Sequence, residues 1–399
     1  MDLEAFRALL EPEGRVALAE AVEILATGAG PVAAATALRR SHPLALTSAA
    51  LTQAGLRRRA AVKFGRDAEV MYFTPHGLEQ ATRAEVAAHR ATGVLRRFGT
   101  PSVLDVCCGV GGDLVALARA GCPVDAVDLD PLTAEVARAN AAALGLSERV
   151  RVRTADAAAT DPSAYGLLFA DPARRGARGR TFDPMAYSPS WPEVLGLVGR
   201  APAACLKVAP GIPYELIPEG TEAEWVSYRG EVKEAAIWVG GGAAGRRATL
   251  LPSGDTLTAS GAEAAAGPVG RYLYEPDGAA VRAHLVAEVA EIVGGHLLDP
   301  RIAYVTGDRL VPTAWASCHE VEEVMPFSLK RLRAALRERR VGTLTIKKRG
   351  SAVDVERLRR DLRLSGDEAA VVVLTRIEDR PYALLCRDVD QAADLRGHA

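Results

Sequence analysis

A glycine-rich stretch, DVCCGVGGD over residues 105–113, is the part of the sequence best suited to chemistry. It follows a short apolar run and precedes a segment with helical spacing, so we expect it at the first turn from a strand to a helix. Gly109 and Gly111 let the backbone approach a ligand closely at such a turn. Asp128 ends the next strand-like run, 23 residues after Asp105, where a carboxylate can accept both hydroxyls of a ribose.

The dinucleotide-binding fingerprint GxGxxG is not met, because Cys107 stands where its first glycine would be. The stretch instead resembles the acid-x-x-x-Gly-x-Gly loop of class I S-adenosylmethionine-dependent methyltransferases. The resemblance implies that S-adenosyl-L-methionine is the cofactor and that an acid at the end of the third strand recognises its adenine amino group. The implied cofactor contacts are Asp105, Cys107, Gly109, Gly111, Asp128, Leu129, Asp156 and Ala157. The alternative is a nucleotide-binding fold whose glycines serve only the turn.

The fourth strand-like run ends in FADPARR, residues 169–175. This resembles the Asp/Asn/Ser-Pro-Pro-aromatic motif of methyltransferases that modify exocyclic amines of bases. A side-chain acceptor and a backbone carbonyl, bonded to the two N–H groups of such an amine, can hold its nitrogen pyramidal and aim it at the methyl group. The candidate catalytic residues are Asp171 as acceptor, Pro172 through its backbone, and Arg174 in the place of the stacking aromatic residue. The alternative is an Asp-Pro pair that caps a helix.

The Asp-Pro-x-Arg pattern is also similar to that of uracil C5 methyltransferases, which need a cysteine nucleophile after the next strand. That place reads KVAPG, residues 207–211, and Cys205 stands inside the strand-like run. The sequence therefore argues against methylation of a ring carbon.

The segment MYFTP, residues 71–75, resembles the part that precedes the glycine loop in the trimethylguanosine synthase group. In that group a similar stretch helps to cover the methionine end of the cofactor, which implies contacts from Phe73 and Thr74. Thr74 also stands directly before Pro75, in the position of a helix N-cap, and this role explains the threonine at least as well.

The chain as a whole resembles a small bacterial family of class I methyltransferases with a THUMP-like C-terminal domain, a domain type that binds structured RNA. The matching stretches include FTPHGLEQAT, DVCCGVGGD, LKVAPGIPY, GEVKEAAIW and KKRGSAVDVERLRRDLR. Residues 330–349 hold nine basic residues and one acid, a net charge of +8 within a chain of net charge −1. The predicted RNA contacts are Arg175, Arg178, Lys330, Arg331, Arg337, Arg340, Lys347, Lys348 and Arg349. A solvated, arginine-rich helix is the alternative.

Composition excludes other classes of protein. The 399 residues are 49% hydrophobic and 25% charged, as in globular proteins, and no apolar run approaches the ~18 residues that a membrane span needs. The six cysteines are scattered and form no CxxC pair, so we expect neither a disulfide framework nor a zinc site, and a reducing cytoplasm fits. The N-terminus does not resemble a signal peptide, and we expect a cytoplasmic protein without a metal.

Strand-like runs alternate with helical segments after residue 102, which predicts a doubly wound, Rossmann-like α/β sheet. Turn-separated runs past residue 220 predict an antiparallel end to that sheet. We expect an N-terminal helical domain over 1–97, ending in one helix from Pro75 to about Arg97, and a methyltransferase domain over 98–265. The C-terminal domain spans 266–399, with one helix expected after the Pro-Asp-Gly turn at 276–278. Its THUMP-like α+β part, at about 318–395, is predicted to run in the order strand, helix, strand, helix, strand, strand.

These features predict methyl transfer from S-adenosylmethionine to an exocyclic base nitrogen of transfer or ribosomal RNA. A methyltransferase acting on a protein or a small molecule is the first alternative, favoured if RNA does not bind. A non-catalytic RNA-binding protein that keeps the methyltransferase fold as a scaffold is the second. The acids and glycines at 105, 109, 111, 128 and 171 are all present, which argues against a scaffold.

Overall fold

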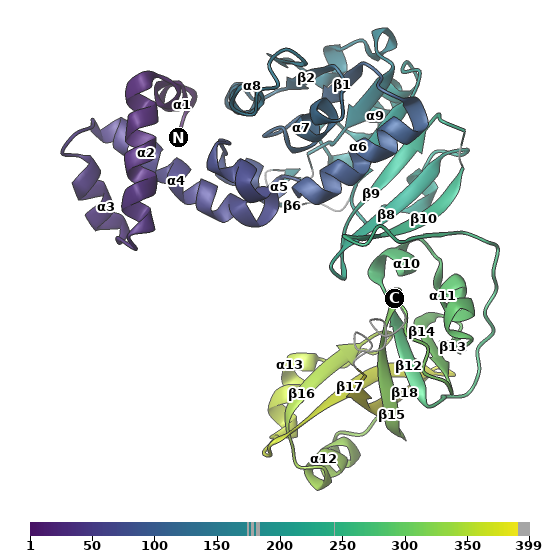
Figure 1. Cartoon of the computed structure of the whole chain (residues 1–399). Helices are drawn as coiled ribbons and strands as arrows, with labels where there is room; N and C mark the ends of the chain where they lie inside the picture. The colour runs from purple at the N-terminus through teal and green to yellow at the C-terminus, as the bar shows by residue number, and fades with distance from the viewer. Residues whose placement is uncertain (174, 177–178, 181–183, 243, 390–399) are drawn as a thin grey trace. The chain divides into compact units, whose positions relative to one another are not determined.

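The computed structural model describes residues 1–173, 175–176, 179–180, 184–242 and 244–389, and Figure 1 draws the whole chain. Contacts divide the chain into two compact units. The first comprises Met1–Ala223 and Glu234–Ala244, and the second comprises Glu224–Lys233 and Gly245–Ala399.

The beginning of the first unit is helical, as its periodic apolar residues predict. Its elements are α1 (Leu3–Leu10), α2 (Pro12–Ala26), α3 (Pro31–Leu38), α4 (Leu44–Phe64), the 3-10 turn η1 (Gly65–Glu69), α5 (Pro75–Gln80) and α6 (Ala84–Phe98). Buried side chains of these helices, such as Phe6 and Leu18, share one core with Val110 of the glycine-rich stretch and with Val136. The helices therefore pack directly on the elements that form the predicted cofactor site.

The single helix predicted from Pro75 to about Arg97 is wrong, because the chain breaks between α5 and α6. Lys63 of α4 caps the C-terminal end of α5. Its Nζ donates hydrogen bonds to three carbonyls at that end, at 2.8–2.9 Å. Thr82, in the break, donates its hydroxyl to Oδ2 of Asp113 at 2.9 Å. These partners are distant in the sequence, so helical spacing could not reveal the break.

A mixed sheet follows the helices. Its strands are β1 (Val103–Val106), β2 (Val124–Asp128), β3 (Val150–Thr154), β4 (Leu167–Ala170), β7 (Ala204–Val208), β8 (Glu222–Tyr228), β9 (Glu231–Val239), β10 (Gly245–Leu251) and β11 (Thr256–Thr258). The strand order is β11-β10-β8-β9-β7-β4-β1-β2-β3. The five strands β3, β2, β1, β4 and β7 are parallel, and β9 runs antiparallel to β7. The predicted doubly wound sheet with an antiparallel end is confirmed.

Helices cover both faces of the parallel strands. They are α7 (Gly112–Arg119), α8 (Pro131–Ala143) and α9 (Trp191–Val198). Side chains of α6, α7 and α8 share a core with alternate residues of the strands, including Phe169 and Trp238, while α9 contacts β4. Because the parallel strands all end at one edge of the sheet, the loops after β1, β2, β3 and β4 meet there.

Shorter elements occupy the connections. They are the 3-10 turns η2 (Ala157–Ala159), η3 (Pro162–Ala164), η4 (Pro184–Ala186) and η5 (Tyr214–Leu216), and the two-residue strands β5 (Arg175–Gly176) and β6 (Gly179–Arg180).

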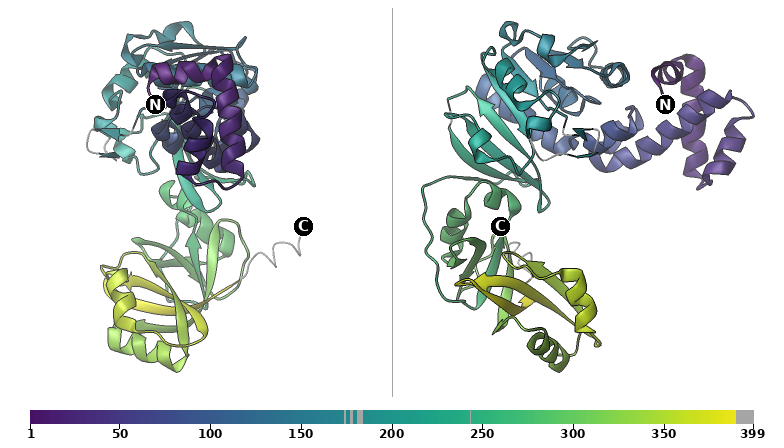
Figure 2. Two further views of the ribbon diagram at one scale, coloured as in Figure 1. Left: turned by 90° about the vertical axis from the view of Figure 1, so that its left-hand side faces the viewer. Right: turned by 180° about the vertical axis from the view of Figure 1, so that it is seen from behind.

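The second unit holds another sheet, with the order β13-β14-β12-β15-β18-β17-β16. Its elements are β12 (Tyr272–Pro276), α10 (Gly278–Arg282), α11 (Val286–Val293), β13 (His296–Asp299), β14 (Ile302–Gly307), β15 (Ala316–Pro326), α12 (Leu329–Glu338), β16 (Val341–Lys348), α13 (Val355–Leu362), β17 (Glu368–Ile377) and β18 (Arg380–Asp388). The predicted order of the tail, strand-helix-strand-helix-strand-strand, is confirmed. Figure 2 shows α12 and α13 next to the long strands, on which both helices pack.

Two features of this unit were not predicted. The helix expected after the Pro-Asp-Gly turn is split into α10 and α11, and His284 between them has a left-handed backbone with φ of +53°. The other feature is the set of strands β12, β13 and β14, which lie before and after that helical segment and were not predicted as strands.

Candidate active site

The glycine-rich stretch connects β1 to α7, and its backbone is left-handed at three positions. The φ angle is +67° at Cys107, +58° at Gly109 and +86° at Gly111. Glycine adopts these angles without strain, which explains the glycines at 109 and 111. A Cβ added at Gly109 would have nothing within 4 Å, so this part of the loop faces open space.

Cys107 has a left-handed backbone although it is not a glycine. Substitutions at this position therefore test the conformation of the loop. We expect Cys107→Val to lower the free energy of unfolding by about 1–2 kcal/mol, because a left-handed backbone crowds a branched Cβ. Cys107→Gly should leave stability unchanged or raise it slightly, and Cys107→Ser, which keeps the shape of the side chain, is the control. Urea unfolding measures all three. Equal stability of the valine and glycine variants would contradict the loop conformation.

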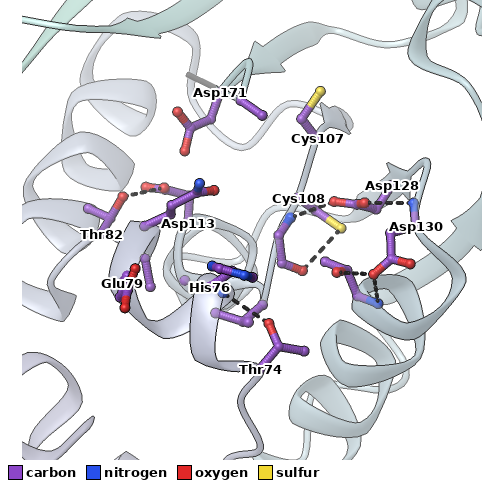
Figure 3. A pocket seen from close by; sticks show the side chains of 18 of the residues that line it. Thr74, His76, Glu79, Thr82, Cys107, Cys108, Asp113, Asp128, Asp130 and Asp171 are labelled. Atoms are coloured by element: carbon purple, nitrogen blue, oxygen red, sulfur yellow. Dashed lines mark hydrogen bonds between the residues drawn. The ribbon is translucent and has the colours of Figure 1, made fainter. Parts of the chain in front are cut away.

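Two cavities adjoin this stretch. The larger, of about 470 Å³, is lined by α5 and the residues around it, the glycine-rich stretch, the end of β4 and Lys207. The smaller, of about 220 Å³, is lined by the ends of β2 and β3 and by the segment that leads into α9. Cys107, Asp128 and Ala173 line both cavities. Figure 3 shows Asp171 and Cys107 across the larger cavity from Thr74.

Asp128 lies where the two cavities meet. Its Oδ2 accepts a hydrogen bond from the backbone N–H of Gly109, and its Oδ1 accepts one from that of Asp130, both at 3.0 Å. Burial raises the pKa of this carboxyl above its usual value, and the two backbone N–H groups act in the opposite direction. A half-buried carboxylate held in this way is well placed to accept hydroxyl groups of a ligand.

The smaller cavity combines apolar side chains with three carboxylates, those of Asp128, Asp156 and Glu193. Leu129 lines it and is 67% exposed, and Ala157 lines it from η2. Asp156 caps η2, accepting the N–H of Ala158 at 2.9 Å. Ser188 and Glu193, which the sequence did not suggest, complete the opposite wall. The cavity is suited to a planar ring that carries an amino group.

Asp105, the first residue of the glycine-rich stretch and the third of β1, lines neither cavity. It is fully buried, and neither carboxyl oxygen has a hydrogen-bond partner among the described residues. Burial, and then the nearby carboxylates of Asp171 and Asp128, raise its pKa well above the usual value. The predicted direct contact of Asp105 with the cofactor therefore stays a prediction.

Tyr72 and Phe73 are held by two buried amide side chains. Asn140 of α8 exchanges two hydrogen bonds with the backbone of Tyr72, at 2.6 and 2.9 Å. Gln53 of α4 does the same with Phe73, at 3.1 and 2.6 Å. The next residue, Thr74, is fixed by these neighbours and lines the larger cavity.

Of the two predicted cofactor contacts Phe73 and Thr74, the structure brings only Thr74 to the larger cavity. Thr74 caps α5, since its Oγ1 accepts the N–H of Gly77 at 2.9 Å, and it lines the larger cavity as well. The side chain of Phe73 is fully buried and packs against Phe64. A cofactor contact from either residue stays a prediction.

Asp171 follows β4 and faces Lys207, to which sequence reasoning gave no role. The Nζ of Lys207 lies 2.5 Å from Oδ2 of Asp171 and donates to the hydroxyl of Thr82 at 2.7 Å. The strand ACLKV is otherwise apolar, so its composition gave no sign that the lysine reaches a site. The structure thus adds Lys207 and Thr82 to the candidate site.

Sequence comparisons identify three domains along the chain. Residues 103–170 match the family described as Methyltransferase domain, and residues 316–388 match the family described as THUMP domain-like. Residues 2–60 match a domain of unknown function, DUF8688.

An uncharacterised S-adenosylmethionine-dependent methyltransferase of Mycobacterium tuberculosis, found in the strains CDC 1551 and H37Rv, is 38% identical over 336 residues. The match covers 81% of this chain and 90% of that protein. This chain belongs to the S-adenosylmethionine-dependent methyltransferases. A crystal structure from Porphyromonas gingivalis W83 has the same fold, with a TM-score of 0.72 at 22% identity, covering 88% of this chain and 92% of that one.

The charges around the larger cavity fit the cofactor of this methyltransferase, S-adenosylmethionine, which carries a positive sulfonium. Five acidic side chains line the cavity. Among the described lining residues, Lys207 is the one lysine, and there is no arginine. The acids are Glu79, Asp113, Asp128, Asp130 and Asp171. A cleft lined mainly by one sign of charge favours a ligand of the opposite sign.

The basic residues predicted to contact RNA differ in their surroundings. Lys347 and Arg349 form ion pairs with Glu275 of β12, and Arg340 pairs with Asp367 at 2.8 Å. Three others are exposed on α12 and make no ion pair or side-chain hydrogen bond with the described residues: Lys330, Arg331 and Arg337. Charge counting along the sequence could not separate these two groups.

The remaining predicted contacts are less informative. Lys348 is exposed and donates to the carbonyl of Val353 at 3.1 Å. Arg175 belongs to β5, while Arg174 and Arg178 lie outside the described residues.

Two further features concern the described part of the chain. No helix there is long and apolar enough to cross a membrane. No group of three or more His, Cys, Asp or Glu side chains there could hold a metal ion.

Proposed function

We propose that this methyltransferase modifies an exocyclic amino nitrogen of a base in RNA. The observation that carries the proposal is the Asp171-Pro172 pair at the end of β4, because both residues line the larger cavity and one carboxyl oxygen of Asp171 is already held by Lys207. The THUMP-like match over residues 316–388 and the exposed basic side chains of α12 support RNA as the carrier of the base.

The two cavities suggest where each part of the cofactor binds. We assign the ribose hydroxyls to Asp128, because its carboxylate lies at the junction of the cavities. The adenine ring then occupies the smaller cavity against Leu129 and Ala157, with its amino group toward Asp156. The methionine end lies in the larger cavity, between Gly109 and Thr74.

Orientation is the main task of the protein in this reaction. The cofactor supplies a methyl group activated by the sulfonium. The amino group of a base is a weak nucleophile because its lone pair is delocalised into the ring. The amino group donates two hydrogen bonds, one to the carboxylate of Asp171 and one to the carbonyl of Pro172. These hydrogen bonds hold the nitrogen pyramidal, with its lone pair toward the methyl group. The N–C bond forms as the S–C bond breaks, and the nitrogen releases one proton to water.

The proposal is tested by comparing RNA from wild-type cells with RNA from a strain lacking the gene. Mass spectrometry of the nucleosides should show one base-methylated nucleoside that disappears in the deletion strain and returns with the gene. An extract of the deletion strain, incubated with the enzyme and tritiated cofactor, should give a product sensitive to ribonuclease. A label sensitive to protease, or one found in small molecules, would overturn the proposal.

The exposed basic residues of α12 give a separate prediction. Reversing Lys330, Arg331 and Arg337 to Glu should weaken binding of total transfer and ribosomal RNA by about tenfold or more. In a plot of log affinity against log salt concentration, the magnitude of the slope should fall by about 2–3. Each phosphate contact contributes roughly 0.7–0.9 to that slope. Filter binding at several salt concentrations measures both effects.

The matched control reverses three exposed arginines of the N-terminal helices, Arg15, Arg39 and Arg40, for the same change in net charge. Cofactor binding should stay unchanged in both triple variants. Equal RNA affinity and slope for the two would show that α12 is not a phosphate-binding surface.

A further inference from the structure

Lys207 is a buried cation in an otherwise apolar strand. Its side chain is only 6% exposed, and β7 has parallel β4 on one side and antiparallel β9 on the other. A buried ammonium is costly unless acceptors surround it. Lys207 nevertheless lines the larger cavity, so it lies at the reaction site.

The contacts of Lys207 have a fixed direction. The hydroxyl of Thr82 donates its only proton to Oδ2 of Asp113 at 2.9 Å, so it can only accept from Lys207. Asp113 is in turn held by Arg90, which also pairs with Glu234, and both pairs are buried. Oδ2 of Asp113 lies 3.9 Å from Nζ of Lys207. These neighbours of the ammonium are acceptors or anions, so Lys207 acts as a donor and not as a base.

The same contact fixes the carboxylate of Asp171. Lys207 holds Oδ2, while Oδ1 has no hydrogen-bond partner among the described residues and the side chain is 28% exposed. A charge-assisted hydrogen bond is stronger and shorter than a neutral one and restricts rotation of the carboxylate. One oxygen is thereby held in place and the other is left for a ligand.

We propose that Lys207 is the positioning residue for the methyl acceptor: by holding Oδ2 of Asp171, it directs Oδ1 toward the nitrogen to be methylated, and Thr82 aims the lysine. The inference rests on the proposed role of Asp171 as the acceptor of the target N–H, but not on RNA as the substrate. It also gives the break between α5 and α6 a purpose, because that break places Thr82 beside Lys207.

The titratable groups around Asp171 come from several elements. They are Asp105 of β1, Cys107 of the glycine-rich stretch, Arg90 of α6 and Lys207 of β7, while Asp113 of α7 lies 3.9 Å from the ammonium of Lys207. Lys207 is the cation within hydrogen-bond distance of Asp171 among the described residues. Its removal leaves Oδ2 of Asp171 without that donor, so the carboxylate can turn.

The test compares Lys207→Met with Lys207→Arg and Thr82→Val in the full-length enzyme. The acceptor is the extract of the deletion strain, so any class of substrate is included, and tritium transfer gives the rate. We expect Lys207→Met to lower kcat by about tenfold, with S-adenosylhomocysteine affinity within about threefold of wild type. Lys207→Arg, which keeps a cationic donor, should restore part of the rate.

Lys233→Met is the matched control, since it makes the same chemical change at a lysine that does not line the cavity. Wild-type kcat for Lys207→Met, no recovery of rate in Lys207→Arg, or an equal loss of S-adenosylhomocysteine affinity would overturn the proposal. If Lys207→Met does not fold, Thr82→Val decides, because it keeps the lysine and its ion pair; an unchanged kcat there overturns the proposal. Nuclease and protease treatment of the wild-type product tests the RNA substrate separately.

Discussion

Replacing Asp171 with Asn lowers kcat for methyl transfer by about 100-fold or more, while affinity for S-adenosylhomocysteine stays within about threefold. The expected split follows from the place of the residue. Asp171 lines the larger cavity beside Pro172, away from the smaller cavity assigned to adenine. An interaction used mainly in the transition state lowers kcat without a matching loss in cofactor binding.

The asparagine is more informative than an alanine. Lys207 donates to Asp171, so the oxygen of an asparagine amide will face the lysine and its NH₂ group will face the cavity. Two donors then oppose each other where the target N–H needs an acceptor. Asp171→Ala removes the acceptor too, but it leaves the buried Lys207 without its carboxylate, which costs stability and confuses the result.

The measurement pairs steady-state rates with calorimetric titration of S-adenosylhomocysteine. Asp161→Asn is the control, because Asp161 is exposed, caps η3 and lines neither cavity. Loss of S-adenosylhomocysteine binding in step with kcat would make Asp171 a structural residue. Full activity of Asp171→Asn would remove it from the mechanism.

The meeting of three acids at one edge of the sheet could be predicted because parallel strands impose their geometry. Asp128, Asp156 and Asp171 each stand at or just after the end of a recognisable strand-like run, and the carboxyl ends of parallel strands meet at one edge of the sheet. Strand order and the place of the glycine-rich loop were sufficient for this step. No side-chain contact had to be known in advance.

The role of Lys207 could not be predicted in this way, because its hydrogen-bond partners come from segments that are distant in the sequence. Thr82 is 125 residues from Lys207 in the chain, and Asp171 is 36 residues away. Within an apolar run, one lysine gives no sign of what it meets. The ion pair of Lys347 with Glu275 shows the same limit, since 72 residues separate the two.

The break between α5 and α6 shows how tertiary contacts override local spacing. Residues 81–83 continue the helical pattern in the sequence, yet Lys63 and Asp113 each bind groups there. The hydrogen bonds that end the helix come from α4 and α7. A helix end fixed by such contacts carries no capping signal of its own in the sequence.

Replacing Asp128 with Ala weakens binding of S-adenosylhomocysteine at least tenfold, and by about 100-fold if both ribose hydroxyls lose their acceptor. Hydrogen bonds to a charged group contribute roughly 1.5–3 kcal/mol each. The substitution also frees the backbone N–H of Gly109, which Oδ2 of Asp128 holds at 3.0 Å, so the loop loses one of its constraints. Both effects act on the ligand at the junction of the two cavities.

Protonation should imitate this substitution. Burial raises the pKa of Asp128, so the wild-type enzyme loses its charged acceptor at a higher pH than an ordinary aspartate would. Its affinity for S-adenosylhomocysteine should therefore fall on the acid side, and that part of the fall should be absent from Asp128→Ala. Calorimetric titration at several pH values measures the difference between the two proteins.

Asp125→Ala is the control for this pair of results. It makes the same change on the same strand, at a carboxylate that accepts the hydroxyl of Tyr165 at 2.8 Å and lines neither cavity. Urea unfolding of both variants separates a loss of binding from a loss of folding. A folded Asp128→Ala protein with unchanged affinity would place the ribose elsewhere. The smaller cavity would then lose its assignment to adenine, because that assignment follows from placing the ribose on Asp128 at the junction of the two cavities.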